Sequence, residues 1–83
     1  MKIKKYAFLL LKGISDSSAT DALSALTLQR IQRSVSDSAK SDRMTKRYLD
    51  ELEEQGLIAR GAMEGRAYTW YITAKGTNLL KSM

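Results

Sequence analysis

A cluster of basic side chains between Leu28 and Leu49 is the part of the sequence best suited to binding a charged ligand. Six bases and two acids fall in this stretch. The bases are Arg30, Arg33, Lys40, Arg43, Lys46 and Arg47, and the acids are Asp37 and Asp42. Arginine and lysine at this density bind phosphate oxygens. The net charge of +5 on 83 residues also indicates a polyanionic partner, such as nucleic acid or an acidic membrane surface.

Catalytic side chains are scarce. The chain contains no Cys and no His, which excludes disulfides, thiol catalysis, imidazole acid–base chemistry and the usual zinc sites. A run of acids at Glu51, Glu53 and Glu54 is typical of a solvated helix face, and no nucleophile with a base partner can be identified. We therefore expect a protein that is not an enzyme and that uses no cofactor or metal.

Two successive helical patterns carry the basic residues. The first has apolar residues three and seven positions apart, at Leu28, Ile31 and Val35. It predicts a helix over 28–35 with Thr27 as its N-cap. A short polar turn leads to the clearest helical pattern of the chain, SDRMTKRYLDELEEQ, over 41–55. Gly56 follows it, in the position where a left-handed residue commonly ends a helix.

The predicted helix over 41–55 has an apolar side that faces the core and a charged side that faces solvent. At about 100° per residue, Thr45, Tyr48 and Leu49 share the core direction of Leu52, with Met44 at the margin. The exposed side carries bases in its first half and acids in its second, at Lys40, Arg43, Lys46, Arg47, Asp50 and Glu54. This order opposes the helix dipole but suits a helix that enters the DNA major groove by its N-terminal end. A solvated face of mixed charge is the alternative interpretation.

After Gly56 the apolar period changes to two. The alternation of Tyr68, Trp70 and Ile72 with polar or small neighbours predicts a strand, and Leu57–Met63 predicts its partner, with the bend at Glu64 and Gly65. We expect Tyr48, Tyr68 and Trp70 in the core rather than as base-stacking platforms, and Tyr71 on the outer face. A short last helix should follow Thr73, with Leu79 and Leu80 returning to the core.

The first segment has apolar residues at helical spacing. They predict a core helix over about 2–13, with lysines at the edges of its apolar face. The apolar run YAFLLL ends at Lys12, which is too short for a signal peptide or a membrane span, so we expect a cytoplasmic protein. A secretory signal is the alternative.

Ser18 and Asp21 have the spacing of a capping box and predict a short helix over 19–26.

Taken together, these segments resemble the winged helix-turn-helix family of DNA-binding proteins, particularly its MarR-like and PadR-like regulators. LDELEEQGLIAR is similar to the family's end of recognition helix and first wing strand. WYITAKG is similar to the family pattern Tyr-x-Leu-Thr-x-x-Gly, with Trp70 in the aromatic position, and LTLQRIQRSV resembles the preceding helix. The resemblance covers about 25–80. The segment Gly13–Ser24 is longer than the family's usual link, and nothing matches its long dimerisation helices.

The resemblance implies an α+β winged helix-turn-helix fold. It has three to four helices, a C-terminal two-stranded β-hairpin wing and a short final helix. Residues 1–83 would form one domain, with the helix-turn-helix over about 27–55 and the wing over about 57–73. The implied function is that of a sequence-specific regulator of transcription that binds double-stranded DNA and no membrane. A homodimer is expected, because one recognition helix reads only a few base pairs.

The resemblance also implies which side chains contact DNA. The groove-facing residues would be Ser38, Lys40, Ser41, Arg43, Lys46 and Arg47. Arg60 and Arg66 would lie on the wing, against a flanking phosphate or the minor groove, while Arg30 and Arg33 would hold the backbone from the preceding helix. The alternative is a winged-helix module that binds another protein, marked by an exposed apolar patch around Tyr6, Phe8 and Leu9.

Overall fold

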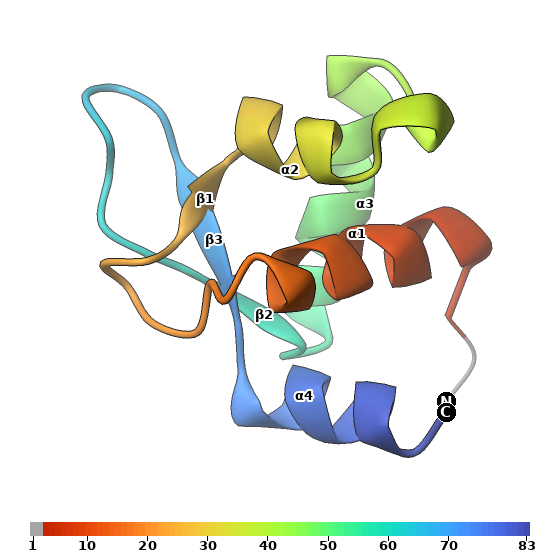
Figure 1. The fold of residues 1–83 in the computed structure, drawn as a ribbon. Coiled ribbons are helices and arrows are strands. Elements are labelled where there is room, and N and C mark those ends of the chain that lie inside the picture. Colours follow the sequence, from red (N-terminus) through yellow and green to blue (C-terminus); the bar gives the residue numbers. More distant parts are fainter. Residues whose placement is uncertain (1–2) are drawn as a thin grey trace.

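The computed structural model, which describes residues 3–83, consists of four α-helices, a short 3-10 helix and a small sheet (Figure 1). The elements in chain order are α1 (Lys5–Asp16), β1 (Leu26–Thr27), α2 (Leu28–Ser34), the 3-10 helix η1 (Ser36–Ser38), α3 (Asp42–Glu54), β2 (Ile58–Arg60), β3 (Thr69–Ile72) and α4 (Ala74–Lys81). The strands form an antiparallel sheet in the order β1-β3-β2. A helix-turn-helix followed by a β-hairpin makes this an α+β winged helix fold.

Both helices of the helix-turn-helix begin at a side-chain N-cap, at the predicted Thr27 for α2 and at Ser41, the first residue of the predicted helical pattern, for α3. The Thr27 hydroxyl accepts a hydrogen bond from the Arg30 amide at 3.4 Å, and the Ser41 hydroxyl accepts one from the Met44 amide at 3.2 Å. Each bond satisfies one of the amides that a first helical turn leaves without a partner. Gly56 has a φ of 77° and ends α3 in the left-handed region, where a side chain would be strained. The predictions for Thr27 and Gly56 are confirmed.

The turn between α2 and α3 is fixed at Lys40. Its carbonyl accepts a hydrogen bond from the Gln32 side-chain amide at 3.1 Å, and its amide donates to the Tyr6 hydroxyl at 3.0 Å. The same hydroxyl lies 2.8 Å from Oγ1 of Thr45 in α3. Tyr6 comes from α1, so a single buried side chain connects the first helix to the start of α3. The orientation of α3 is therefore set by α1 as well as by α2.

The first helix differs from its prediction at its C-terminal end. The predicted start at residue 2 lies outside the described residues, and the helix begins at Lys5. It continues through Gly13 to Asp16, so the end predicted at residue 13 is wrong. A Cβ on Gly13 would collide with the Ser34 hydroxyl of α2. This glycine permits a close helix–helix approach and does not end the helix.

The helix predicted over 19–26 is also wrong. The Asp21 carboxylate instead accepts hydrogen bonds from the amides of Leu23 and Ser24, each at 2.9 Å, and closes a tight turn. The hydrogen bond from the Ser24 amide is the main reason why the pKa of the Asp21 carboxyl lies below its usual range. The chain then continues as β1, in which Leu26 lies opposite Trp70. The long link before α2 thus adds a third strand to the predicted hairpin.

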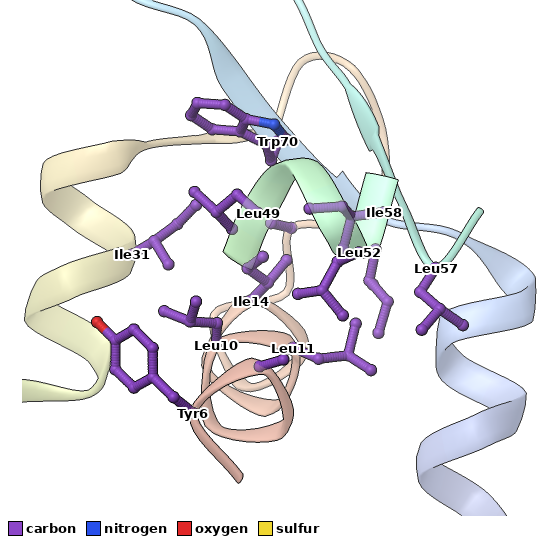
Figure 2. Close-up of a cluster of buried hydrophobic side chains, with 13 residues drawn as sticks. Tyr6, Leu10, Leu11, Ile14, Ile31, Leu49, Leu52, Leu57, Ile58 and Trp70 are labelled. Carbon is purple, nitrogen blue, oxygen red and sulfur yellow. The ribbon is translucent and has the colours of Figure 1, made fainter. Parts of the chain in front are cut away.

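The core lies between α1, α3 and the sheet. Figure 2 shows its side chains converging from separate elements, with Trp70 at one end of the cluster and Tyr6 at the other. Its largest fully buried members are Trp70, Leu10, Leu11, Ile14, Ile31, Leu49, Leu52, Leu57, Ile58 and Thr45. Burial of each large aliphatic side chain contributes about 1.5–3 kcal/mol. This packing holds the inner face of α3 and leaves its opposite face in solvent.

The aromatic residues of the hairpin are distributed between core and surface differently from the prediction. Trp70 is 2% exposed and confirmed as core, whereas Tyr68 is 49% exposed, so its predicted core position is wrong. The reason is the length of the hairpin pairing: β3 begins at Thr69, and β2, its partner in the hairpin, covers Ile58–Arg60 rather than Leu57–Met63. Beyond this short ladder the pleat that would have turned Tyr68 inward is lost. Tyr71, predicted on the outer face, is half-buried against the core.

Gly76 allows α4 to lie against the sheet. A Cβ there would collide with the Leu57 carbonyl and lie 2.7 Å from Cγ1 of Ile72. Leu79 and Leu80 pack against the core from the same helix, as predicted. No helix within residues 3–83 combines the length and the apolar character needed to cross a bilayer.

Gly76→Ala is expected to destabilise the fold, although alanine favours helices. Overpacking costs about 1–3 kcal/mol, and here the added Cβ would collide with a backbone carbonyl that cannot rotate away, so we expect a cost toward the upper end, above the propensity gain of about 1 kcal/mol. Urea unfolding measures the difference. Asn78→Ala, at an exposed position of α4, is the control and should leave stability unchanged or slightly raised. Parent-like stability of Gly76→Ala would contradict the close packing.

Candidate nucleic-acid interface

The exposed face of α3 carries basic side chains on its N-terminal half. Arg43 and Arg47 are exposed, and neither forms an ion pair with any residue in the range 3–83. Lys46 pairs with Asp50 one turn further on, with Nζ 2.7 Å from Oδ1. Acids occupy the C-terminal half, where Asp50 and Glu54 are exposed. The charge order predicted by helical rotation is therefore present, and the two uncompensated cations lie near the start of the helix.

A cleft of about 640 Å³ lies between α2, α3 and the hairpin. Four predicted site residues line it: Arg30, Arg33, Lys46 and Arg66. Asp42 and Glu64 are the acids of its wall. Nη2 of Arg30 lies 3.4 Å from Oε1 of Glu64, with both side chains more than half exposed. Exposed ion pairs of this kind contribute only about 0–1 kcal/mol, so a phosphate can replace the carboxylate at little cost.

Arg60 and Arg66 occupy different environments. Nε of Arg60 lies 3.0 Å from Oε1 of Glu53, and Nη2 lies 3.7 Å from Oδ1 of Asp50. Its guanidinium lies over the Tyr68 ring, 4.1 Å from the centroid. The hydrogen bond with Glu53 raises the pKa of Arg60 against a smaller opposing effect of desolvation. Arg60 therefore links the base of the hairpin to α3, and its charge is compensated by Glu53 and Asp50.

Arg66 lies at the turn of the hairpin, which Figure 1 shows projecting away from the helices. It follows Gly65, whose φ is 62°, and it is exposed and lines the cleft. The two arginines predicted together on the wing thus differ in what they can offer a ligand. Arg66 presents a charge without an ion pair in the described part of the chain, and Arg60 presents a charge already shared with two acids.

The remaining predicted residues lie around the start of α3. Ser41 uses its hydroxyl as the N-cap of this helix. Ser38 ends η1 and lines a hollow beside α1. Nζ of Lys40 lies 5.5 Å from the centroid of the Tyr6 ring, so this side chain is directed to α1. The structure therefore places Arg43, Lys46 and Arg47 on one exposed face and puts Ser38 and Lys40 on the flank that meets α1.

The exposed apolar patch around Tyr6, Phe8 and Leu9 that would mark the alternative protein-interaction module is not formed. Tyr6 is 5% exposed and belongs to the core, while Phe8 and Leu9 are half-buried. The large exposed apolar residues of the described chain are instead Leu23, Met44, Met63, Tyr68 and Met83. Residues 3–83 also contain no group of three or more acids arranged to hold a metal ion.

Comparisons with known proteins identify the fold class. No family model matches the sequence. No curated protein matches it either. Among solved structures, TubR from Bacillus megaterium pBM400 superposes with a TM-score of 0.81 at 18% identity, over 96% of this chain and 84% of that one. The DNA-binding TubR fragment from Clostridium botulinum gives 0.75 at 23% identity, over 99% and 98%.

BpsR from Bordetella bronchiseptica, described for the regulation of its DNA binding by 6-hydroxynicotinic acid, also superposes on this chain. The TM-score is 0.79 at 18% identity, over 99% of this chain and 53% of BpsR. This chain therefore spans about half the length of BpsR. The similarity to all three structures establishes the winged helix fold. At identities this low it does not transfer function.

Proposed function

We propose that this protein is a sequence-specific transcriptional regulator that binds double-stranded DNA through α3. The observation that carries the proposal is the pair of exposed, uncompensated arginines on the N-terminal half of α3, Arg43 and Arg47, beside a basic cleft. Among the structures that share this fold, BpsR and the TubR fragment from Clostridium botulinum are described as DNA-binding. The exposed face of α3 is free of core contacts and supplies the charge that this function needs.

In the proposed complex the start of α3 enters the major groove. Arg43 and Arg47 reach guanine edges or the adjoining phosphates, because a guanidinium can donate two hydrogen bonds to O6 and N7 of guanine. The acids Asp50 and Glu54 stay outside the groove, about one to three turns further along the helix. Lys46 exchanges Asp50 for a phosphate, which its exposed pairing permits.

The cleft beside α3 holds the DNA backbone in this proposal. Arg30 and Arg33 approach a phosphate from α2, and Arg66 approaches from the hairpin turn. Residues 1–83 act as one domain, with the helix-turn-helix over about 27–55 and the wing over about 57–73, and two copies pair on DNA to read two half-sites. The role is binding, without catalysis or a cofactor.

Selection of genomic fragments by the purified protein tests the proposal. The expected result is a set of fragments that share two half-sites separated by about 10 bp or a multiple of it. Affinity for those fragments should fall steeply with salt, because each phosphate contact releases counterions. Absence of any enrichment or salt-dependent binding, with recovery of a stoichiometric protein partner instead, would favour the protein-interaction module.

Arg66→Ala and Arg60→Ala are expected to affect binding differently. Arg66→Ala should reduce the slope of log affinity against log salt by about 0.9, the contribution of one phosphate contact to B-DNA. Arg60→Ala removes the same formal charge, but that charge is already shared with Glu53 and Asp50, so the slope should change less while stability falls. Fluorescence anisotropy across a salt series measures both slopes. Equal slopes for the two variants would contradict the assignment of Arg66 to the interface.

A further inference from the structure

A second basic hollow lies on the flank of α3 that faces α1. It has a volume of about 490 Å³ and lies between the start of α1, the turn before α3 and the middle of α3. Its polar wall consists of Lys4, Lys5, Lys40, Ser38, Tyr6 and Tyr48. None of its lining residues is an acid. Three ammonium groups from segments about 35 residues apart in the sequence are thus gathered around one hollow.

Two of the ammonium groups are held on aromatic rings. Nζ of Lys4 lies 5.5 Å from the centroid of Tyr48, and Nζ of Lys40 lies 5.5 Å from the centroid of Tyr6. The two rings contact each other edge to face, with centroids 5.4 Å apart and planes at 76°. Lysine side chains normally lose much rotamer freedom when they bind. Because these two are already positioned, less of that freedom remains to be lost when an anion binds.

The charge of the hollow is only partly compensated. Lys4 lies 3.7 Å from Oε1 of Glu51, with its own side chain 66% exposed. Lys5 and Lys40 form no ion pair within residues 3–83. The hollow therefore carries a net positive charge, and an anion can reach it from solvent. A phosphate group fits this arrangement of separate point charges.

The hollow and the basic cleft lie on opposite flanks of α3. Lys46 lines the cleft and Tyr48 lines the hollow, and two residues correspond to a rotation of about 200° around the helix. A helix in the major groove has a phosphate backbone on either side, and most protein–DNA hydrogen bonds go to such backbones. The cleft can meet only one of the two.

We propose that Lys4, Lys5 and Lys40 bind the DNA phosphate backbone on the side of the major groove away from the wing. This rests on the proposed function and extends it, because α3 is then held by phosphate contacts on both flanks. It also assigns a binding role to the start of α1, through Lys4 and Lys5, and moves Lys40 from base reading to backbone contact. Tyr6 and Tyr48 are positioning residues, which hold the ammonium groups without touching DNA.

Salt-dependent binding to a selected fragment tests the inference with Lys4→Gln/Lys40→Gln. Its slope of log affinity against log salt should decrease by nearly two, at about 0.9 per phosphate contact. The matched control is Lys12→Gln/Lys81→Gln, which removes two exposed charges beside a different hollow, between α1 and α4. The control should keep the parent slope. Lys4→Arg/Lys40→Arg retains both charges and should keep it as well.

The outcomes separate the inference from the function on which it rests. If the parent binds the fragment and Lys4→Gln/Lys40→Gln keeps its slope, the inference is wrong and the proposed function stands. An equal loss in the Lys12→Gln/Lys81→Gln control, which would reflect net charge alone, also overturns it. If the parent shows no salt-dependent duplex binding at all, the proposed function and the inference both fail. An unfolding temperature equal to that of the parent confirms that each variant is folded.

Discussion

Arg43→Ala/Arg47→Ala is expected to bind a specific duplex at least about 30-fold more weakly than the parent. Each well-placed arginine contact to a base contributes about 1–3 kcal/mol of discrimination, and 1.4 kcal/mol corresponds to a factor of ten in affinity. The loss should fall mainly on specific DNA, because base contacts distinguish sequences and phosphate contacts do not. Competition binding with specific and unrelated duplexes measures both affinities.

A control variant shows whether the position of the two arginines or only their charge matters. Lys12→Ala/Lys81→Ala removes the same number of charges from exposed sites on α1 and α4, so it should change specific binding much less. Both arginines are exposed and unpaired within the described residues, and we therefore expect the unfolding temperature to match the parent. Equal affinities for the arginine variant and the parent would show that α3 does not read DNA.

Trp70→Ala is expected to destabilise the fold by about 3–5 kcal/mol, the usual cost of deleting a large buried aromatic side chain. Trp70 is almost completely buried, and its indole N–H donates to Oε1 of Glu53 at 3.3 Å. It joins the sheet to α3, so its loss should loosen the contact between the hairpin and this helix. Small domains have stabilities of about 5–15 kcal/mol, and this variant should be close to unfolding at room temperature.

Tyr68→Ala is the matched control for Trp70→Ala. Tyr68 is half exposed and packs mainly under the Arg60 guanidinium, an interaction of about 0.5–1 kcal/mol at such a site. Denaturant unfolding of both variants should give a much larger change for the tryptophan. Similar changes would mean that the division of these two aromatic residues between core and surface is wrong.

Local signals in the sequence are sufficient for the helix-turn-helix. Thr27, Ser41 and Gly56 act within one turn of their own helices, and each ends or begins a helix where its residue type predicts. The inward and outward faces of α3 follow from helical rotation alone, so the sequence by itself places Arg43 and Arg47 on the exposed face.

Where the sequence pattern predicts the wrong secondary structure, contacts with residues far away in the sequence determine the structure that forms. Asp21 has the spacing of a capping box, but the neighbouring Ala22 carbonyl accepts a hydrogen bond from the Ala62 amide, and the segment joins the sheet instead of forming a helix. Tyr68 follows the strand period but lies beyond the end of the paired ladder. The length of a strand depends on how far its partner pairs with it, and the periodicity of one segment contains no information about that partner.

The candidate interface shows the same division. Arg60 and Arg66 look equivalent in the sequence, and only the fold shows that Glu53 and Asp50 compensate the first of them. The hollow formed by Lys4, Lys5 and Lys40 cannot be found from spacing, because it requires the start of α1 to lie against the start of α3. Sequence patterns identify the basic helix, and the tertiary contacts determine which of its neighbours can act with it.

Chemical-shift mapping of the backbone amides during titration with a selected duplex tests the central claim most directly. We expect the largest changes at the start of α3 and its N-cap, over Ser41–Arg47, and at Arg66 in the hairpin turn, while the exposed surface of α1 and α4 around Lys12 and Lys81 stays unchanged. Changes concentrated at Lys12 and Lys81, with α3 unaffected, would contradict it.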